Sequence, residues 1–586
     1  MTVSSLLLPN VTWAAERVNV EGVRYDTAHD GGSWAWDGAN GLTLNNYTGG
    51  PISAAGELNI AYSGANAVTG TGDRGISVTN GENEDASLSI SNKGEGSLAV
   101  TEDDYDAIYC EGNIDISGSG TVQATSTGSY TGIKSDSGDV SISGSGNVRA
   151  EGTGYEGIEA HNVTISSSGT VEATGGYIGI DADNDLVITG GGKTTAKGQS
   201  YGVDAGKLDV SNGSSLAAQG ESGIDCSYLM TVSGGSKVDV TASDGRGIDG
   251  ADEGMFIRDG SIVTVTSKGD KGIEADGALT IEGGSTLIVS ADGYDGVCAE
   301  KKIEIDASTV KSTAKLGSAL KSFEGPFIIR NGSLVEALAT NNDDGAAIFS
   351  YGDWKSDDLE ASAAIDISDS TVTAIAKYAD GYGPEDGKSS GIYAEFWPGS
   401  DPAVISIKRS NVTASGGQYA ILSGHGYRSD DEIKGDRGTI HIEDSNIVTP
   451  QGAHIANIEY DYEYPYPPTK FHYLGQTLAI GDNPTGVTPD DEAIVKEVLI
   501  KVPEAPAPDP TPAPDPTPAP EPSEKPADTV KPAAASAKPA AAKAASKVAA
   551  DLPQTGDRAS IVIATLGAAG VAALAIGAAV LRRRLS

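Results

Sequence analysis

Apolar and polar residues alternate in short runs that repeat at a nearly constant interval along the chain. A tetrad of Gly, Ile or Val, a variable residue and a small residue recurs about every 23 residues, beginning at Gly132, Gly157, Gly179, Gly202, Gly223, Gly247, Gly272 and Gly296. An alternating triplet such as Val140-Ser141-Ile142 follows each tetrad, and a second triplet such as Val148-Arg149-Ala150 begins eight residues after the first. Because side chains alternate between the two faces of a strand, each repeat predicts three short strands.

Repeats of three short strands predict an all-β fold built by stacking. One repeat cannot bury its apolar side chains alone, whereas stacked repeats share one narrow core. A β-propeller would need four strands and roughly 40–50 residues per unit. The sequence therefore predicts a single-stranded parallel β-helix with three short strands per rung of about 23 residues. The interval between the two triplets shortens from eight residues to seven at Ile303/Val310, Ile365/Val372, Ile405/Val412 and Ile440/Ile447.

Residues 552–586 contain the three parts of a surface-protein sorting signal. The motif Leu552-Pro553-Gln554-Thr555-Gly556 is followed by an uncharged stretch, residues 559–581, and then by Arg582, Arg583 and Arg584. The stretch is long enough to cross a membrane as a helix, and the arginines favour a cytoplasmic end. The arrangement resembles the LPxTG signal of Gram-positive surface proteins; the alternative is a plain single-span membrane protein. The resemblance implies export to the cell wall, cleavage by a sortase between Thr555 and Gly556, and covalent attachment of Thr555 to peptidoglycan. The membrane would be contacted only through the sorting helix.

Amino-acid composition and the repeat pattern divide the rest of the chain into a signal-peptide remnant, a β-helix with two caps and a linker. Residues 503–551 hold 13 of the 26 prolines and predict a semi-rigid linker that spans the wall. Residues 1–14 are similar to the remnant of a signal peptide that lacks a basic start. The β-helix is predicted over residues 51–460, with caps at 15–50 and 461–502 that cover its open ends.

The net negative charge of the chain lies on residues 1–502, which contain the predicted β-helix with its caps and are called the head below. The net charge is −42, and residues 503–586 carry nine Lys or Arg against eight Asp or Glu, which leaves −43 on residues 1–502. This balance excludes direct binding to nucleic acid, because such affinity comes from basic residues that neutralise phosphates. The three cysteines, Cys110, Cys226 and Cys298, cannot form a disulfide framework and are expected to be small core or surface residues.

Several repeats resemble a known family. Segments such as Gly132-Ile133-Lys134-Ser135-Asp136 and Gly272-Ile273-Glu274-Ala275-Asp276, each followed by a triplet and a Gly-rich turn, are similar to carbohydrate-binding β-helix domains of Firmicutes and Actinobacteria surface proteins. The resemblance covers residues 100–310. It implies a right-handed, polysaccharide-lyase-like β-helix that binds plant cell-wall polysaccharides and Ca²⁺.

The third position of the tetrad carries a row of charged residues that is expected to face solvent. It holds Lys134 and then, in successive repeats, Glu159, Asp181, Asp204, Asp225, Asp249 and Glu274, with Asp183 and Asp276 two residues further on. Carboxylates stacked about 4.8 Å apart repel one another unless cations or water screen them, and clustered oxygen ligands suit Ca²⁺. These eight carboxylates are the candidate Ca²⁺ ligands. The alternative is that they only keep an exported head soluble.

Two sets of aromatic residues are candidates for binding a sugar. Long insertions around residues 348–440 carry Tyr351, Trp354, Tyr382, Phe396, Trp397 and Tyr427, and loops on a rigid scaffold are frequent binding sites. Two residues before the tetrad, four successive repeats carry Tyr105, Tyr130, Tyr155 and Tyr177, and a later repeat carries Tyr294. The insertions are the first candidate and the tyrosines, which are equally compatible with a packing ladder, are the rival site.

No catalytic residue is predicted, because the six histidines have no metal-ligand spacing and no nucleophile motif occurs. The leading expectation is a sortase-anchored adhesin whose head binds polysaccharide without cleaving it, with or without Ca²⁺. A Ca²⁺-dependent polysaccharide lyase is one alternative. A passive stalk or protein-binding adhesin is the other.

Overall fold

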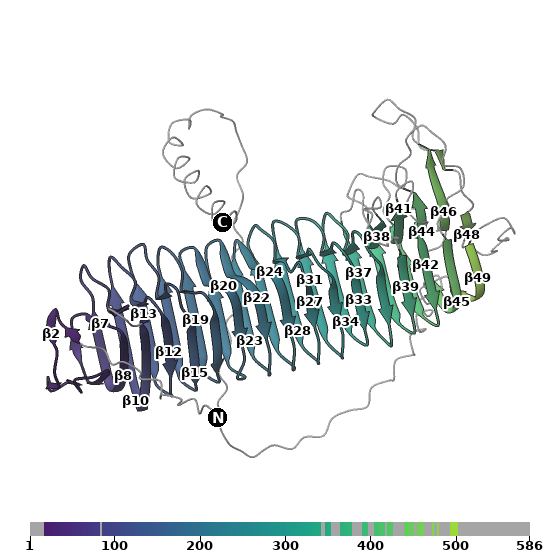
Figure 1. Cartoon of the computed structure of the whole chain (residues 1–586). Helices are drawn as coiled ribbons and strands as arrows, with labels where there is room; N and C mark the ends of the chain where they lie inside the picture. Colours follow the sequence, from purple (N-terminus) through teal and green to yellow (C-terminus); the bar gives the residue numbers. More distant parts are fainter. Residues whose placement is uncertain are drawn as a thin grey trace, which may run out of the picture. The chain divides into compact units, whose positions relative to one another are not determined.

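The computed structural model confirms an all-β architecture of repeated parallel strands (Figure 1). It describes residues 17–81, 85–340, 346–352, 364–377, 390–396, 403–416, 419–425, 439–449, 454–461, 472–473, 477–479 and 493–501. These residues contain no helix, and so none that could cross a membrane. The predicted signal remnant, the linker, the sorting motif and the apolar stretch 559–581 lie outside the described residues.

The strands form three ladders of parallel pairs, one for each strand of the repeat. The tetrad ladder contains β7 (Ile52–Ala55), β9 (Ile76–Thr79), β11 (Ile108–Cys110), β14 (Ile133–Ser135), β17 (Ile158–Ala160), β20 (Ile178–Ile188), β22 (Tyr201–Val210), β24 (Ser222–Val232), β26 (Ile248–Gly250), β29 (Ile273–Ala275), β32 (Val297–Ala299), β35 (Leu320–Ser322), β38 (Ala346–Gly352), β41 (Ser390–Phe396), β44 (Tyr419–His425) and β46 (His454–Asp461).

The middle ladder follows the first triplets. It includes the second halves of β20, β22 and β24, together with β5 (Gly41–Asn45), β8 (Glu57–Thr69), β10 (Ser87–Glu102), β12 (Asn113–Ser117), β15 (Val140–Gly144), β18 (Val163–Ser167), β27 (Gly254–Ile257), β30 (Leu279–Ile281), β33 (Ile303–Asp306), β36 (Phe327–Arg330), β39 (Ala364–Ser368), β42 (Val404–Lys408), β45 (Thr439–Val448) and β49 (Ala493–Lys501).

The closing ladder follows the second triplets and leads back to the next tetrad. It includes the second halves of β8, β10, β45 and β49, together with β6 (Thr48–Gly49), β13 (Thr121–Ser126), β16 (Asn147–Gly152), β19 (Thr170–Gly175), β21 (Lys193–Lys197), β23 (Ser215–Gly220), β25 (Lys237–Ala242), β28 (Ile262–Ser267), β31 (Thr286–Ala291), β34 (Thr309–Ala314), β37 (Leu334–Ala339), β40 (Thr371–Ala376) and β43 (Asn411–Ser415).

The core is a narrow column of small and branched side chains between the ladders. The second tetrad position is fully buried in successive rungs, as at Ile133, Ile158 and Ile180. Glycine at the first position allows this close approach: a Cβ on Gly157 would lie 2.5 Å from the backbone nitrogen of Thr174 in the closing ladder. Aliphatic burial therefore drives the stacking, and the tetrad glycine makes room for it.

The turn between the middle and closing ladders explains the two triplet intervals. From Leu186 onward, rungs with the eight-residue interval place two residues in the left-handed region before the closing strand, as at Gly283 and Gly284. The earlier rungs with this interval place one residue there or none, and their left-handed residues are Gly118 and Gly144. Rungs in which the two triplets begin seven residues apart place one residue there: Ala307, Asp369, Arg409 or Asp444. The shorter interval is thus a turn with one left-handed residue fewer, and the rungs on either side keep their register.

From Ser214 onward a buried serine ends each of these turns and links neighbouring rungs, whereas the earlier turns have glycine at this position. From Ser236 to Ser333, each serine N–H donates to the hydroxyl of the serine in the next rung at 3.2–3.3 Å, through Ser261, Ser285 and Ser308. The same pattern joins Ser370 to Ser410 and Ser410 to Ser445 at 3.2 Å. Since a buried backbone N–H without an acceptor is costly, this serine ladder holds the turns in register.

Antiparallel strands lie at both ends of the ladders. β1 (Val18–Val20) pairs antiparallel with β2 (Val23–Tyr25) and β7, while β3 (His29–Asp30), β4 (Trp34–Trp36) and β5 form an antiparallel meander. At the other end β46 pairs antiparallel with β47 (His472–Tyr473) and β48 (Thr477–Ala479). β49, within the segment predicted as a cap, pairs parallel with β45 and so continues the middle and closing ladders.

The cysteines are buried and free, but they occupy two different positions. Cys110 and Cys226 take the fourth, inward position of the tetrad and are fully buried. Cys298 aligns with Glu274 in the outward third position, where it is 5 % exposed. Burial is the first cause that raises the pKa of each thiol, which makes them poor nucleophiles.

The serine ladder predicts a specific loss of stability. Ser285→Ala removes the acceptor for the buried N–H of Ser261, so the free energy of unfolding should fall by roughly 1–3 kcal/mol. The matched control is Ser290→Ala on β31, whose side chain is exposed and should change stability by less than about 0.5 kcal/mol. Chemical denaturation of both variants measures the difference, and equal stabilities would show that the ladder contributes nothing.

Candidate functional site

The third tetrad positions form one continuous column on the outer face of the tetrad ladder. Register pairs run in order through Lys134, Glu159, Asp181, Asp204, Asp225, Asp249 and Glu274. The six acidic members are called the acidic column below. Their side chains are half-buried, because each lies between the neighbours above and below it. Asp183 is exposed and Asp276 is half-buried beside the column.

Basic residues neutralise both ends of the acidic column. At one end the Lys134 ammonium lies 2.7 Å from a carboxylate oxygen of Glu159. At the other end the Arg246 guanidinium lies 2.8 Å from Asp249 and 2.7 Å from Glu274, which also pairs with Lys271. The repulsion between stacked carboxylates is therefore offset by ion pairs where the column begins and ends.

Between these ends, protonation relieves the repulsion. Burial, and after it the negative charges of Asp204 and Glu156, raise the pKa of Asp181 to about 8. Glu156, only 8 % exposed, lies next to it and accepts a 3.0 Å hydrogen bond from the Thr131 hydroxyl. Burial and the charge of Glu159 raise the pKa of Glu156 well above its ordinary value. Near neutral pH Asp181 is consequently largely protonated and Glu156 partly so.

The arrangement does not fit a preformed Ca²⁺ site. Ca²⁺ takes six to eight oxygen ligands around one point, whereas the column supplies one carboxylate per rung. Within the described part of the chain no group of three or more His, Cys, Asp or Glu is arranged to hold a metal. Glu159, Asp249 and Glu274 are held by basic partners. Calcium binding stays a prediction, and no step of the function below depends on it.

Four exposed tyrosines form a second column at the turn that precedes the tetrad strand. Tyr105, Tyr130, Tyr155 and Tyr177, called the tyrosine ladder below, are between 37 % and 52 % exposed. The rings of Tyr105 and Tyr130 lie 5.4 Å apart, and the N–H of Tyr177 donates to the carbonyl of Tyr155 at 2.9 Å. The rings of Tyr105 and Tyr130 pack on each other, and all four rings also present apolar surface to solvent, as sugar-binding aromatics do.

Polar groups border the tyrosine ladder on the side of the acidic column. The residue after each tyrosine is buried in all four rungs: Asp106, Thr131, Glu156 and Ile178. Asp106 is held by the Thr131 N–H at 3.1 Å and by Arg74 at 3.3 Å. Exposed rings and nearly buried polar side chains therefore lie side by side along one edge of the tetrad ladder.

Most of the aromatic insertion site predicted from the sequence cannot be placed. Trp354, Tyr382, Trp397 and Tyr427 lie outside the described residues, and of Phe396 only the backbone, at the end of β41, is described. Tyr351 is half-buried and packs at 5.1 Å from the ring of Phe323 and 6.0 Å from that of Phe349. The insertions stay a predicted site, and the tyrosine ladder is the candidate that the described residues carry.

Beyond Glu274 the outward column changes from acidic to aromatic. The third tetrad positions continue through Cys298, Lys321, Phe349, Tyr393 and Leu422. Phe349 and Tyr393 stack with ring centroids 5.2 Å apart, and both are at most 9 % exposed. This part of the outer face is thus a second packed cluster, separate from the axial core.

Sequence reasoning missed the buried acids beside the tyrosines. Asp106 and Glu156 directly follow Tyr105 and Tyr155 and precede the tetrad, where alternation predicts no outward side chain. The tetrad glycine interrupts that alternation, so the residue before it faces the same side as the third position. A Tyr followed by an acid and a tetrad is the sequence signal that identifies this edge.

Comparisons with known proteins give no relative for this chain: no family model matches it, and no curated protein or solved structure matches it either.

The raised pKa of Asp181 predicts that stability depends on pH. An unfolded Asp has a pKa of about 3.9, so the folded state binds more protons than the unfolded state between about pH 4 and 8. Stability from this group is therefore present below pH 4 and is lost as pH rises toward 8. Asp181→Asn should raise the melting temperature relative to wild type at pH 8.5 and have little effect at pH 4.5.

Asp183→Asn provides the matched control, because the Asp183 side chain is 67 % exposed. It should change the pH profile much less than Asp181→Asn does, because the charge of Asp183 is the smallest of the causes that raise the pKa of Asp181. An equal effect of the two variants would contradict the assignment to Asp181. Millimolar CaCl₂ compared with NaCl at equal ionic strength tests calcium in the same samples. A ligand bound only by the native state raises the melting temperature, and identical curves would remove the calcium prediction.

Proposed function

We propose that this chain is a sortase-anchored surface protein whose β-helix head binds polysaccharide without cleaving it. In this proposal the rungs wind right-handedly, the Pro-rich residues 503–551 carry the head across the wall, and Thr555 becomes the covalent link to peptidoglycan. Residues 559–581 hold the chain in the membrane only until the sortase acts. The protein therefore belongs on the outside of a Gram-positive cell.

The exposed tyrosine ladder is the observation that carries the binding function. Its rings repeat once per rung on a rigid scaffold, so that neighbouring sugar units of one chain can stack on neighbouring rings. Glu156 and Thr131 supply hydrogen-bonding groups beside the rings. A repeating aromatic surface of this kind fits a polymer of repeating units better than a single small molecule.

The ion pairs formed by the basic residues beside the acidic column favour binding over catalysis. A lyase needs a basic group free to take a proton from the sugar. Lys134, Arg246 and Lys271, the basic residues that contact the acidic column, each form an ion pair with it. We therefore do not propose the acidic column as the site of a lyase reaction.

Truncating the tyrosine ladder should weaken polysaccharide binding. The double variant Tyr130→Ala/Tyr155→Ala removes two stacking surfaces of about 1 kcal/mol each, which predicts roughly a tenfold or greater loss of affinity on a glycan array. Its melting temperature should change little, because both rings are exposed. Tyr294→Ala changes an exposed tyrosine at the same position of a later rung, without a tyrosine in the rungs next to it, and should bind as wild type does.

Variants of the insertions decide between the two candidate sites. If Trp354→Ala/Trp397→Ala abolishes binding while the ladder variant binds normally, the site lies in the insertions and the ladder assignment is wrong. If wild type binds no glycan but binds a host protein, the polysaccharide function itself is wrong and the protein-binding alternative holds.

Anchoring predicts a second, separate outcome. Gly556→Ala changes the residue after the cleaved bond and should leave the chain in the membrane or shed from the cell, whereas Gln554→Ala changes the variable position of the motif and should be attached normally. Muramidase release followed by immunoblotting measures the attached fraction. Muramidase-released Gly556→Ala protein at wild-type amounts would rule out sorting at this motif.

A further inference from the structure

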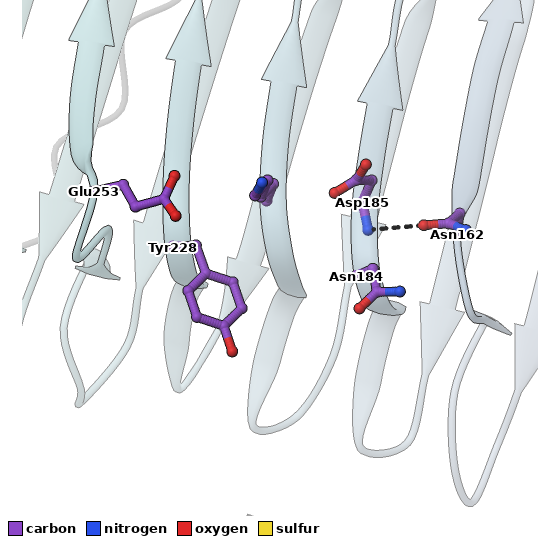
Figure 2. A pocket seen from close by; sticks show the side chains of 6 residues that line it. Asn162, Asn184, Asp185, Tyr228 and Glu253 are labelled. Carbon is purple, nitrogen blue, oxygen red and sulfur yellow. Dashed lines mark hydrogen bonds between the residues drawn. The ribbon is translucent and has the colours of Figure 1, made fainter.

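A shallow pocket of about 350 Å³ lies at the opposite edge of the tetrad ladder from the tyrosines. Six side chains from successive turns between the tetrad and middle ladders line it: Asn162, Asn184, Asp185, Lys207, Tyr228 and Glu253. Figure 2 shows Tyr228 and Glu253 on one side of the pocket and Asn162, Asn184 and Asp185 on the other.

Unequal turn lengths create this pocket. Between the fourth tetrad position and the first triplet, the turn of β22 has two residues, Gly206 and Lys207, whereas the turns of β20 and β24 on either side have three. Gly206 packs so closely under the neighbouring turn that a Cβ there would lie 2.6 Å from the carbonyl oxygen of Asn184. The surface is therefore recessed at β22 and walled by longer turns.

The asparagines on one wall are held in place by the protein. The Asn162 side chain accepts a 3.2 Å hydrogen bond from the Asp185 N–H and donates to the Asp139 carboxylate at 2.7 Å. The Asn184 amide lies 2.8 Å from the ring nitrogen Nε2 of His161. Two amide groups are thus oriented before any ligand arrives, which lowers the entropic cost of binding.

The other lining side chains are not committed to partners. Among the residues that the structure describes, the carboxylates of Asp185 and Glu253 and the ammonium of Lys207 form no ion pair or side-chain hydrogen bond. Tyr228 is 49 % exposed and its ring contacts no other aromatic ring of the described chain. By contrast, the basic residues on the acidic column are all paired. The pocket therefore offers acceptors, a donor and an apolar ring face together.

The charges around the pocket restrict its ligand. Two carboxylates and one ammonium give a net charge of −1 on a head that carries −43, so a polyanion such as a polyuronate is repelled. A cationic ligand would leave the ammonium of Lys207 without an acceptor, so it would use only part of the lining. A neutral ligand with many hydroxyls satisfies all of these groups: carboxylates and amides accept from hydroxyls, lysine donates, and the Tyr228 ring covers an apolar face.

We propose that this pocket binds one pyranose unit of a neutral polysaccharide, as a subsite separate from the tyrosine ladder. The inference rests on the proposed polysaccharide-binding function and narrows its ligand to neutral glycans. Tyr155 of the ladder and Asn162 of the pocket are seven residues apart, about 23 Å of extended chain, with β17 between them. One polysaccharide chain lying across the tetrad ladder can therefore contact both.

The test uses full-length protein in a detergent without a sugar headgroup and measures binding by calorimetry. The probes are cellohexaose, xylohexaose, mannohexaose and hexagalacturonate. Wild type is expected to bind at least one neutral hexasaccharide and to bind hexagalacturonate at least tenfold more weakly. Tyr228→Ala and Glu253→Gln should each weaken neutral binding about tenfold, while Tyr294→Ala should not.

Each of the other possible results of this experiment tests one part of the proposal. Normal binding by both pocket variants, with loss in Tyr130→Ala/Tyr155→Ala, overturns the pocket and leaves the proposed function standing. Hexagalacturonate bound as tightly as the neutral probes overturns the charge argument. Binding to no probe by wild type overturns the pocket proposal, and the glycan array then decides whether polysaccharide binding falls with it. A melting temperature measured on each variant separates lost binding from lost folding.

Discussion

Parallel, in-register stacking of rungs about 4.8 Å apart is the constraint on which every other feature of this head depends. It places each residue directly between two residues of the same position, so an interaction that is favourable once is repeated along the whole axis. The buried second-position aliphatics and the serine ladder use this repetition. The tetrad glycine is its steric consequence, because the tetrad strand has to pass close to the closing strand in every rung.

The same repetition makes charge expensive on the outer face. Six successive acids would repel one another if all were ionised. Ion pairs with Lys134 and Arg246 offset this at the two ends, and the raised pKa of Asp181 removes charge in the middle. Tyrosines can stack without any such penalty, since they are neutral. That difference explains why the exposed ladder is aromatic while the acids need partners or protons.

The sequence was sufficient to predict the strands and the register of both columns, because a 23-residue period is a strong signal in a chain with few competing apolar patterns. The sequence could not indicate that the Glu156 side chain lies beside the acidic column. The tetrad glycine interrupts the alternation from which the inward or outward direction of a side chain is deduced. The serine ladder was hidden because its members resemble the many exposed turn serines. The pocket could not be predicted from the period either, because it arises where one turn is a residue shorter than its neighbours, as at Gly206. A difference of one residue in the turn between the middle and closing ladders likewise accounts for the change of the triplet interval from eight to seven residues near Ala307.

The two proposed binding surfaces and the acidic column belong to a single face, and this has a consequence for specificity. A polysaccharide that reaches from the tyrosine ladder to the pocket has to cross the acidic column between them. A uronate polymer would bring carboxylates against the acidic side chains between the two ends of the column, such as Asp204, whereas a neutral polymer brings hydroxyls that can donate to them. In the proposed function, the acidic column thus weakens the binding of uronate polymers, and it need not increase the affinity for neutral ones. Because Asp181 is largely protonated near neutral pH and Glu156 partly so, they also offer O–H donors to sugar oxygens, which ionised carboxylates could not. In the proposed function, the raised pKa values that relieve repulsion within the fold are the same property that makes this face compatible with a neutral glycan.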